Sequence, residues 1–281
     1  MWRRAASYSM GQGLISWGGR SRQAEQMTQQ STVTPAPSRM RRIFDEAKGL
    51  VVTGAIMLFA GTAIGQPFIV PSGSMEPTLM IGDEIAAAKY AYGYGRYSAP
   101  IGVIPIHGRV LDRPPERGDI VVFALPRDPR QTYVKRVIGM PGDRLQMRAG
   151  KLFINGTEVP RRPVGPITVA LGGVTVPAMK YVETLPGGRT HDIIKVAEGP
   201  LDDTVEFKVP DGHYFMMGDN RDNSLDSRVS PAEGGVGFVP AENLIGRVSR
   251  VLFSITPFSS WLNVITDPTD LRVSRLFHHV N

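Results

Sequence analysis

The sequence predicts a mainly β protein: a membrane-anchored antiparallel β-sheet core with an inserted smaller β/coil lobe, preceded by one transmembrane helix. Three observations lead to this prediction. The chain of 281 residues contains 31 Gly and 23 Pro, so turns should be frequent and long helices few. Valine and isoleucine recur between those turns, as is typical of strands. One long uncharged apolar run, residues 49–65, lies towards the amino terminus.

Residues 1–42 are expected to form a disordered, basic cytoplasmic tail. Residues 1–38 are rich in Gln, Ser, Thr and Pro and lack apolar periodicity. Eight basic and three acidic residues precede Gly49, which accounts for +5 of the net charge of +6. The body of the chain is therefore close to neutral, which argues against a basic groove for nucleic acid.

Residues 43–67 are expected to be the transmembrane anchor. The uncharged run is about 17 residues long, at the short end for a bilayer span, and the apolar residues 68–70 extend it towards the interface. Four basic residues precede the run between positions 39 and 48, and the next one after it is Lys89. The positive-inside rule then places the amino terminus in the cytoplasm and the body outside. A buried core helix and a cleaved secretory signal peptide are the alternatives for this segment.

Beyond the anchor, short apolar segments separated by turn residues predict a β-rich core made of residues 68–159 and 213–265. Residues 160–212 are Pro/Gly-rich with poorer alternation, which indicates an inserted lobe. Residues 266–281 are expected to form a C-terminal tail, in which residues 270–281 form a short amphipathic helix. Asn155-Gly156 is typical of a two-residue hairpin turn. Strands are expected at residues 83–89, 118–125, 132–140, 144–148, 151–154, 213–217 and 244–255.

Neither a cofactor nor a metal is predicted. The chain has no cysteine, which excludes disulfides and Cys-based zinc sites, and its five histidines are scattered apart from the final pair. The segment MGDNRDNSLDSR, residues 217–228, holds three aspartates, but Arg221 occupies a ligand position of the EF-hand pattern and the required glycine is missing. A hydrogen-bonded loop that holds nearby cations is the better interpretation.

Two serines, Ser72 and Ser74, stand in the bent segment PSGSMEPTL directly after the apolar run. A serine becomes a nucleophile when a base takes its proton. His107 and His213 lie in plausible strands, but neither has a carboxylate in an obvious orienting position. The alternative base is a buried, neutral lysine, because burial lowers the pKa of an amine by roughly 3–5 units.

Lys135 is the candidate for this base. In the strand TYVKRVIGM, residues 132–140, alternation places Lys135 and Arg136 on opposite faces. One of them can then enter an apolar site while the other pairs with a carboxylate. An ordinary lysine that protects an edge strand is the alternative. Ser224, in the aspartate-rich segment, is able to hydrogen-bond a lysine amine.

Taken together, these segments resemble the bacterial type I signal peptidases, also called leader peptidases, of the Ser/Lys dyad family. The resemblance covers roughly residues 45–265 and includes the order of the motifs and the preceding anchor. It rests on PSGSMEPTL (71–79), GDIVVF (118–123), YVKRVIGMPGD (133–143) and GDNRDNSLDSR (218–228).

The resemblance implies a membrane-bound serine endopeptidase that cleaves N-terminal signal peptides from exported preproteins after small residues, at A-x-A type sites. Ser74 would be the nucleophile and Lys135 the general base. The Ser72 hydroxyl and the Ser74 backbone N–H would form the oxyanion hole, and Ser224 would orient the lysine amine. The lobe, residues 160–212, would be non-catalytic. The charged residues implied to brace the site are Arg136, Asp226 and Arg228.

The implied partners are secretory preproteins and the lipid bilayer. The implied location is the bacterial inner (cytoplasmic) membrane, crossed once, with the catalytic domain on the outer, periplasmic face. Shallow apolar pockets would accept small side chains, and an extended substrate would add as a strand beside residues 68–70. Phe68 and Val70 share a face with Ser72 if the strand runs unbroken to the turn, and together with Met75 and Val134 they are the pocket candidates.

Two further functions fit parts of this pattern. A conjugation-type peptidase or a self-cleaving repressor would use the same chemistry on one dedicated protein. A repressor, however, should carry a DNA-binding helical domain in place of the anchor, and a conjugation peptidase should lack so large an insertion. A non-enzymatic, anchored β module would tolerate the loss of both Ser74 and Lys135.

Overall fold

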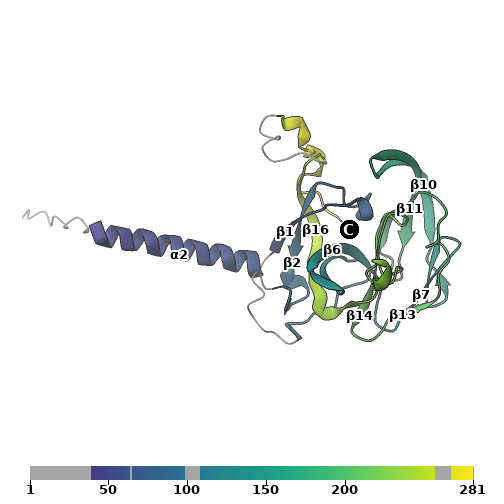
Figure 1. The fold of residues 1–281 in the computed structure, drawn as a ribbon, viewed down its shortest axis with the longest axis horizontal. Helices are drawn as coiled ribbons and strands as arrows, with labels where there is room; N and C mark the ends of the chain where they lie inside the picture. The colour runs from purple at the N-terminus through teal and green to yellow at the C-terminus, as the bar shows by residue number, and fades with distance from the viewer. Residues whose placement is uncertain (1–38, 64, 99–107, 257–266, 281) are drawn as a thin grey trace, which may run out of the picture. The chain divides into compact units, whose positions relative to one another are not determined.

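The computed structural model describes residues 39–63, 65–98, 108–256 and 267–280, and these residues confirm a mainly antiparallel β fold. The largest sheet has seven strands in the order β1-β2-β16-β5-β6-β14-β15, and every pairing in it is antiparallel. Figure 1 shows β1, β2, β16 and β6 side by side in this sheet. Its strands are β1 (Gly65–Ile69), β2 (Asp83–Ala88), β5 (Ile120–Leu125), β6 (Asp128–Gly139), β14 (His213–Met217), β15 (Val239–Pro240) and β16 (Leu244–Ser254).

Both faces of the central strand β5 are buried, which explains its unbroken apolar sequence. Ile120, Val122 and Ala124 belong to one core cluster, and Val121, Phe123 and Leu125 to another. Successive side chains of a strand point to opposite faces, so an amphipathic alternation is absent where both faces are covered. The first cluster also contains the residues that follow β1, namely Val70, Met75 and Leu79.

The predicted strands agree closely with the observed ones. Residues 144–148, 151–154 and 213–217 match β7 (Arg144–Arg148), β8 (Lys151–Ile154) and β14. Asn155 and Gly156 join β8 to β9 (Thr157–Glu158), and both have positive φ, 54° and 80°, as a type I′ hairpin turn requires. Strand β6 begins at Asp128, before the predicted start at residue 132.

The region predicted as a lobe forms a sheet of two long strands and one shorter strand, with the order β10-β11-β12. These are β10 (Arg161–Leu171), β11 (Val174–Thr184) and β12 (Thr190–Lys195). Strand β13 (Phe207–Lys208), also in the lobe, pairs with β7 in the sheet β13-β7-β8-β9. The small sheet of β3 (Tyr94–Gly95) and β4 (Arg109–Val110) completes the fold. The domain boundaries given above stay a prediction.

Helix α2 (Arg39–Ala63) covers most of the predicted anchor. Within the described residues, no helix meets both the length and the apolarity that crossing a membrane requires. Several large apolar side chains of α2, including Leu50, Val51 and Met57, are exposed. The tail expected at residues 1–42 lies outside the described residues except for positions 39–42, which are helical.

The predicted C-terminal helix is wrong. Residues Pro268–Asp270 and Val273–Arg275 form single 3-10 turns instead. Hydrogen bonds to the core hold this segment in place: the Arg275 Nε donates to Asp83 Oδ1 at 2.9 Å, and its Nη2 donates to the carbonyl of Thr78 at 3.0 Å. These long-range contacts outweigh the weak helical pattern of a short segment.

Candidate active site

The first candidate residue, Ser74, lies in a single 3-10 turn, Gly73–Met75, that follows the end of β1. Backbone hydrogen bonds close the turn, from Glu76 N–H to the Gly73 carbonyl and from Leu79 N–H to the Met75 carbonyl. Met75 and Leu79 are completely buried, so the turn is anchored from below. This support holds the Ser74 hydroxyl in one place, as a nucleophile requires.

Lys135 reaches this turn from β6, 61 residues along the chain. Its Nζ lies 2.6 Å from the Ser74 Oγ and also donates to the carbonyl of Val134 at 3.1 Å. Only 4% of Lys135 and 7% of Ser74 is exposed. The structure therefore brings the two predicted residues into direct hydrogen-bond contact in a dry environment.

The surroundings of Lys135 favour its neutral form. Burial lowers its pKa from 10.5 to about 8, and the carboxylates of Asp226 and Asp219 act in the opposite direction. An amine with this pKa is substantially unprotonated slightly above neutral pH, so it is able to accept a proton from a hydroxyl.

Ser72 is exposed, and its Oγ lies 3.4 Å from the Ser74 Oγ. Ser72 and Ser74 both line the cavity described below. A donor at this position is placed to reach an oxyanion that forms on a carbonyl attacked by Ser74.

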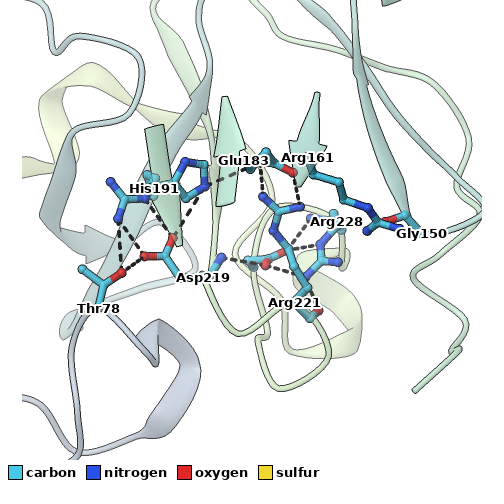
Figure 2. Close-up of polar contacts among 11 residues, drawn as sticks. Thr78, Gly150, Arg161, Glu183, His191, Asp219, Arg221 and Arg228 are labelled. Carbon is cyan, nitrogen blue, oxygen red and sulfur yellow. Dashed lines mark hydrogen bonds and ion pairs between the residues drawn. The ribbon is translucent and has the colours of Figure 1, made fainter. Parts of the chain in front are cut away.

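Arg136, the neighbour of Lys135, is fully buried and binds a different partner. Its guanidinium donates to both carboxylate oxygens of Asp219, at 2.8 and 2.7 Å, and to the Gly118 carbonyl at 2.7 Å. Asp219 also accepts a hydrogen bond of 2.5 Å from the Thr78 hydroxyl (Figure 2). Asp219 thus joins the strand of Lys135 to the segment after Ser74. Sequence reasoning did not single it out, although it stands in the quoted aspartate-rich motif.

Asp226 and Arg228 form a second buried ion pair within the loop of residues 217–228. Asp226 accepts from the Arg228 Nε at 2.9 Å, from Nη2 at 2.8 Å and from the Gly218 N–H at 3.0 Å. A Cβ added to Gly218 would lie 2.5 Å from the Ser74 carbonyl oxygen. The ion pair therefore fixes a loop whose backbone packs directly against the nucleophile turn.

The expected hydrogen bond between Ser224 and the lysine amine is not present. The Ser224 Oγ is buried and has no hydrogen-bond partner among the described residues. The Lys135 Nζ instead bonds to Ser74 and to the Val134 carbonyl. A Cβ added to Gly218 would collide with the Ser224 side chain as well as with the Ser74 carbonyl, so Ser224 lies close to the nucleophile turn. Its role as the orienting residue stays a prediction.

A cavity of about 360 Å³ opens beside the Ser74–Lys135 pair. Two of the four predicted pocket residues, Phe68 and Val134, line it. Val70 and Met75 do not: both are buried in the core cluster behind the turn. Phe68 packs against the same cluster and Ile69 is exposed, so the alternation holds to Val70, but Val70 and Met75 are buried too deeply to line the cavity. Sequence reasoning missed the other apolar lining residues, which are Ile69, Pro71, Ile85, Val122, Tyr133 and Leu225.

Among the residues that the structure describes, no group of three or more His, Cys, Asp or Glu side chains is arranged to hold a metal ion. The side chains able to act as nucleophile, base and oxyanion donor are those of Ser74, Lys135 and Ser72. A nucleophile, a base of lowered pKa and an oxyanion donor at the mouth of an apolar cavity are suited to acyl transfer.

Comparison with known proteins gives an independent result. Residues 43–253 match the family model described as signal peptidase, peptidase S26. A signal peptidase I of Rickettsia typhi is 42% identical over 219 residues, which cover 75% of this chain and 80% of that protein. A signal peptidase I of Rickettsia canadensis is 41% identical over 229 residues, or 78% and 83% of the two chains. The crystal structure of a signal peptidase I from Enterococcus faecalis is 28% identical and covers 48% of this chain and 97% of that one, with a TM-score of 0.27.

Proposed function

The chain belongs to the signal peptidase family, peptidase S26, and on that premise we propose that Ser74 and Lys135 are the dyad with which it removes signal peptides from exported proteins. The observation that carries the proposal is the distance of 2.6 Å between the Lys135 Nζ and the Ser74 Oγ. The burial that lowers the lysine pKa supports it, because only the neutral amine accepts a proton.

The geometry supports the following reaction. The Ser74 Oγ attacks the scissile carbonyl carbon while Lys135 takes the hydroxyl proton. The carbonyl electron pair moves to the oxygen, where the Ser72 hydroxyl and the Ser74 N–H donate hydrogen bonds. The C–N bond then breaks, and Lys135 returns the proton to the leaving amine. Water, deprotonated in turn by Lys135, hydrolyses the acyl-enzyme ester.

Substrate binding is proposed along β1. This strand stands at the end of the seven-stranded sheet, so an extended peptide is able to pair with it by main-chain hydrogen bonds. Phe68 and Val134 would then face the residues just before the cleaved bond. A shallow apolar surface accepts methyl groups and excludes larger side chains, which favours an A-x-A type site.

The direct test is cleavage of a purified preprotein with Ala at positions −1 and −3 by the detergent-solubilised chain. We expect one cut, after the −1 residue, as shown by sequencing the amino terminus of the product. A matched preprotein with Phe at −1 should be cut at least about a hundredfold more slowly, because the side chain does not fit. Equal cleavage of both substrates would contradict the proposed pocket.

We further propose that the segment around α2 holds the chain in a lipid bilayer, with the catalytic domain on the outer face of the bacterial inner membrane. Its exposed apolar side chains and the basic residues before them support this location. The anchored chain should remain with the membrane after an alkaline carbonate wash. Release into the supernatant would contradict the anchor.

Activity should depend on pH through Lys135. Its folded-state pKa of about 8 is below the ordinary value, so the active, neutral form increases as the pH rises through 8. We expect kcat/KM to fall about tenfold for each pH unit between 7 and 5, because the neutral fraction falls by that factor well below the pKa. The measurement is peptide cleavage from pH 5 to 10 with active enzyme counted by titration. A profile that is flat from pH 5 to 9 would exclude Lys135 as the base.

A further inference from the structure

Buried ionisable side chains join the inserted lobe to the catalytic loop, residues 217–228 (Figure 2). The lobe contributes two of them, and the remaining members come from the loop and from β6. None of these side chains is more than 3% exposed. The cluster consists of Arg136, Glu183, His191, Asp219, Arg221, Asp226 and Arg228.

The lobe residues are direct neighbours across a strand pair. Glu183 on β11 is opposite His191 on β12, and the His191 Nε2 lies 3.5 Å from Glu183 Oε2 and 4.0 Å from Asp219 Oδ1. Glu183 receives both terminal nitrogens of Arg221, one at 3.0 Å. Arg161, across from Glu183 on β10, instead donates to the carbonyl of Gly150, as Figure 2 shows. The carboxylate of Glu183 therefore neutralises the loop arginine.

Backbone hydrogen bonds attach the same loop to the same strand. The Ile194 N–H of β12 donates to the Asp219 carbonyl at 2.9 Å, and the Arg221 N–H donates to the Ile194 carbonyl at 3.0 Å. They form a parallel bridge between Ile194 and Asn220. The loop thus continues the lobe's sheet, and Glu183 fixes the side chain of the residue that forms the second bond.

From the loop the connection continues to the catalytic pair. The Asn220 N–H donates to the Ser74 carbonyl at 3.2 Å. Asp219 binds Thr78, four residues after Ser74, and Arg136, the neighbour of Lys135. A displacement of residues 219–221 would therefore move the nucleophile and the base relative to each other.

The cluster also sets the charge that Lys135 experiences. The carboxylates of Asp219 and Asp226 raise the pKa of Lys135, against the larger effect of burial. Arg221 interacts with the same two carboxylates as well as with Glu183. His191 is neutral at the pH of catalysis, because burial, followed by Arg136, lowers its pKa to about 4. The two carboxylates that act on Lys135 are themselves paired: Arg136 binds Asp219, Arg228 binds Asp226, and Arg221, the partner of Glu183, interacts with both.

We propose that Glu183 is a positioning residue of the catalytic pair: through Arg221 it holds the loop against Ser74 and keeps the arginine charge away from Asp219 and Asp226. The lobe is then part of the catalytic framework, and not only an appended module. This proposal rests on the proposed roles of Ser74 and Lys135. A buried ion pair contributes little net stability, because the attraction between its charges barely offsets the cost of removing them from water. It does fix the orientation of both partners.

The test compares Glu183→Gln and Glu183→Asp by their pH profiles of peptide cleavage, with active enzyme counted by titration. Glu183→Gln removes a negative charge and leaves Arg221 to act on Asp219 and Asp226, which disfavours the proton on Lys135. We expect kcat to fall about tenfold and the midpoint of the acid limb to move down by about half a pH unit. Glu183→Asp keeps the negative charge, but the shorter side chain places the carboxylate farther from Arg221. We therefore expect kcat to fall about threefold with the midpoint unchanged.

Asp192→Asn is the matched control. Asp192 is adjacent to His191 on β12 and pairs with Lys180 of β11 at 2.7 Å, on the partly exposed side of the same strands. Loss of this pair should change neither kcat nor the midpoint. A merely structural role for Glu183 would lower the amount of active enzyme while leaving the midpoint in place.

The proposal is overturned if Glu183→Gln has the wild-type midpoint, or if Asp192→Asn shifts it equally. Should Glu183→Gln not fold, Glu183→Asp decides alone: a lowered kcat supports the proposal, and a wild-type kcat overturns it. Cleavage by a Ser74→Ala variant would overturn the proposed function itself. Loss of cleavage in Ser74→Ala, together with an unmoved Glu183→Gln profile, would overturn only the positioning role.

Discussion

Replacing Ser74 with alanine should lower kcat/KM for preprotein cleavage by at least about a thousandfold, the size of effect seen when a catalytic nucleophile is removed. The substitution deletes the side-chain oxygen that lies within hydrogen-bond distance of the Lys135 amine. The amine keeps its bond to the Val134 carbonyl, so the surrounding fold should be retained. The measurement is product formation on gels at several enzyme concentrations, with thermal unfolding as the check on folding.

Substitutions of two other serines show whether the effect of Ser74→Ala is specific to the attacking group or follows the loss of any hydroxyl. Ser72→Ala removes a hydroxyl 3.4 Å from the Ser74 Oγ and should cost about a hundredfold, as loss of one oxyanion donor does. Ser230→Ala breaks an exposed hydrogen bond to Glu233 and should leave the rate unchanged. Full activity in a folded Ser74→Ala variant would remove Ser74 as the attacking group.

The strands were predictable because they depend on local sequence, whereas the roles of Ser74 and Lys135 came from the resemblance to a family and stay a prediction. Turn residues with positive φ, such as Asn155 and Gly156, mark strand ends regardless of what packs on them. The apolar residues of β5 and those next to Lys135 likewise indicate buried strands, and they can be recognised from the sequence alone. The distance between Lys135 and Ser74 itself follows from a sheet of seven strands, whose order no local pattern gives.

The pocket was predicted less well, for a specific physical reason. Alternation holds from Phe68 to Val70, since Ile69 between them is exposed and Phe68 packs against the core cluster that contains Val70. Hydrogen bonds of Val70 with the Asp83 carbonyl and the Gly82 N–H keep it paired with the neighbouring segment. The depth to which a side chain is buried is a tertiary property, so Val70 and Met75, which are 1% and 0% exposed, were expected at the pocket surface but lie in the core.

The lobe shows a signal that sequence reasoning left unused. Glu183 and His191 stand at equal distances from Gly187, on two segments that flank the Gly187-Gly188 turn, so a hairpin would place them opposite each other. An acidic residue and a histidine at facing positions were readable as a pair. That their face is buried against Arg221 depends on the tertiary fold, and for this reason the lobe was interpreted as unconnected to the chemistry.

Replacing Lys135 with methionine should abolish cleavage, with a loss of at least about a thousandfold at every pH, because no other group takes the proton from Ser74. Methionine keeps the length and the apolar stem of lysine. It should therefore fill the same volume in contact with Tyr133 and Val134. The measurement is kcat/KM from pH 6 to 10, which should show no rise through pH 8.

Stability should move in the other direction from activity. Lys135 binds its proton less tightly when folded, with a pKa of about 8 against 10.5. Burial of Lys135 therefore lowers the free energy of unfolding. The whole of this destabilisation is present below pH 8, where Lys135 is protonated in both the folded and the unfolded state, and it disappears as the pH rises above 10.5. Methionine carries no proton, so the melting temperature at pH 7 should equal or exceed that of the wild type. An inactive variant with unchanged or higher stability would place the defect in the chemistry.

A second buried lysine provides the matched control. Lys89 is fully buried, its Nζ has no hydrogen-bond partner among the described residues, and burial lowers its pKa as well. It does not line the cavity beside Ser74. Lys89→Met should therefore raise stability at neutral pH in the same way while leaving cleavage and its rise through pH 8 intact. If Lys135→Met cleaved as well as Lys89→Met, a buried amine would be dispensable, and the base would have to be sought elsewhere in the chain.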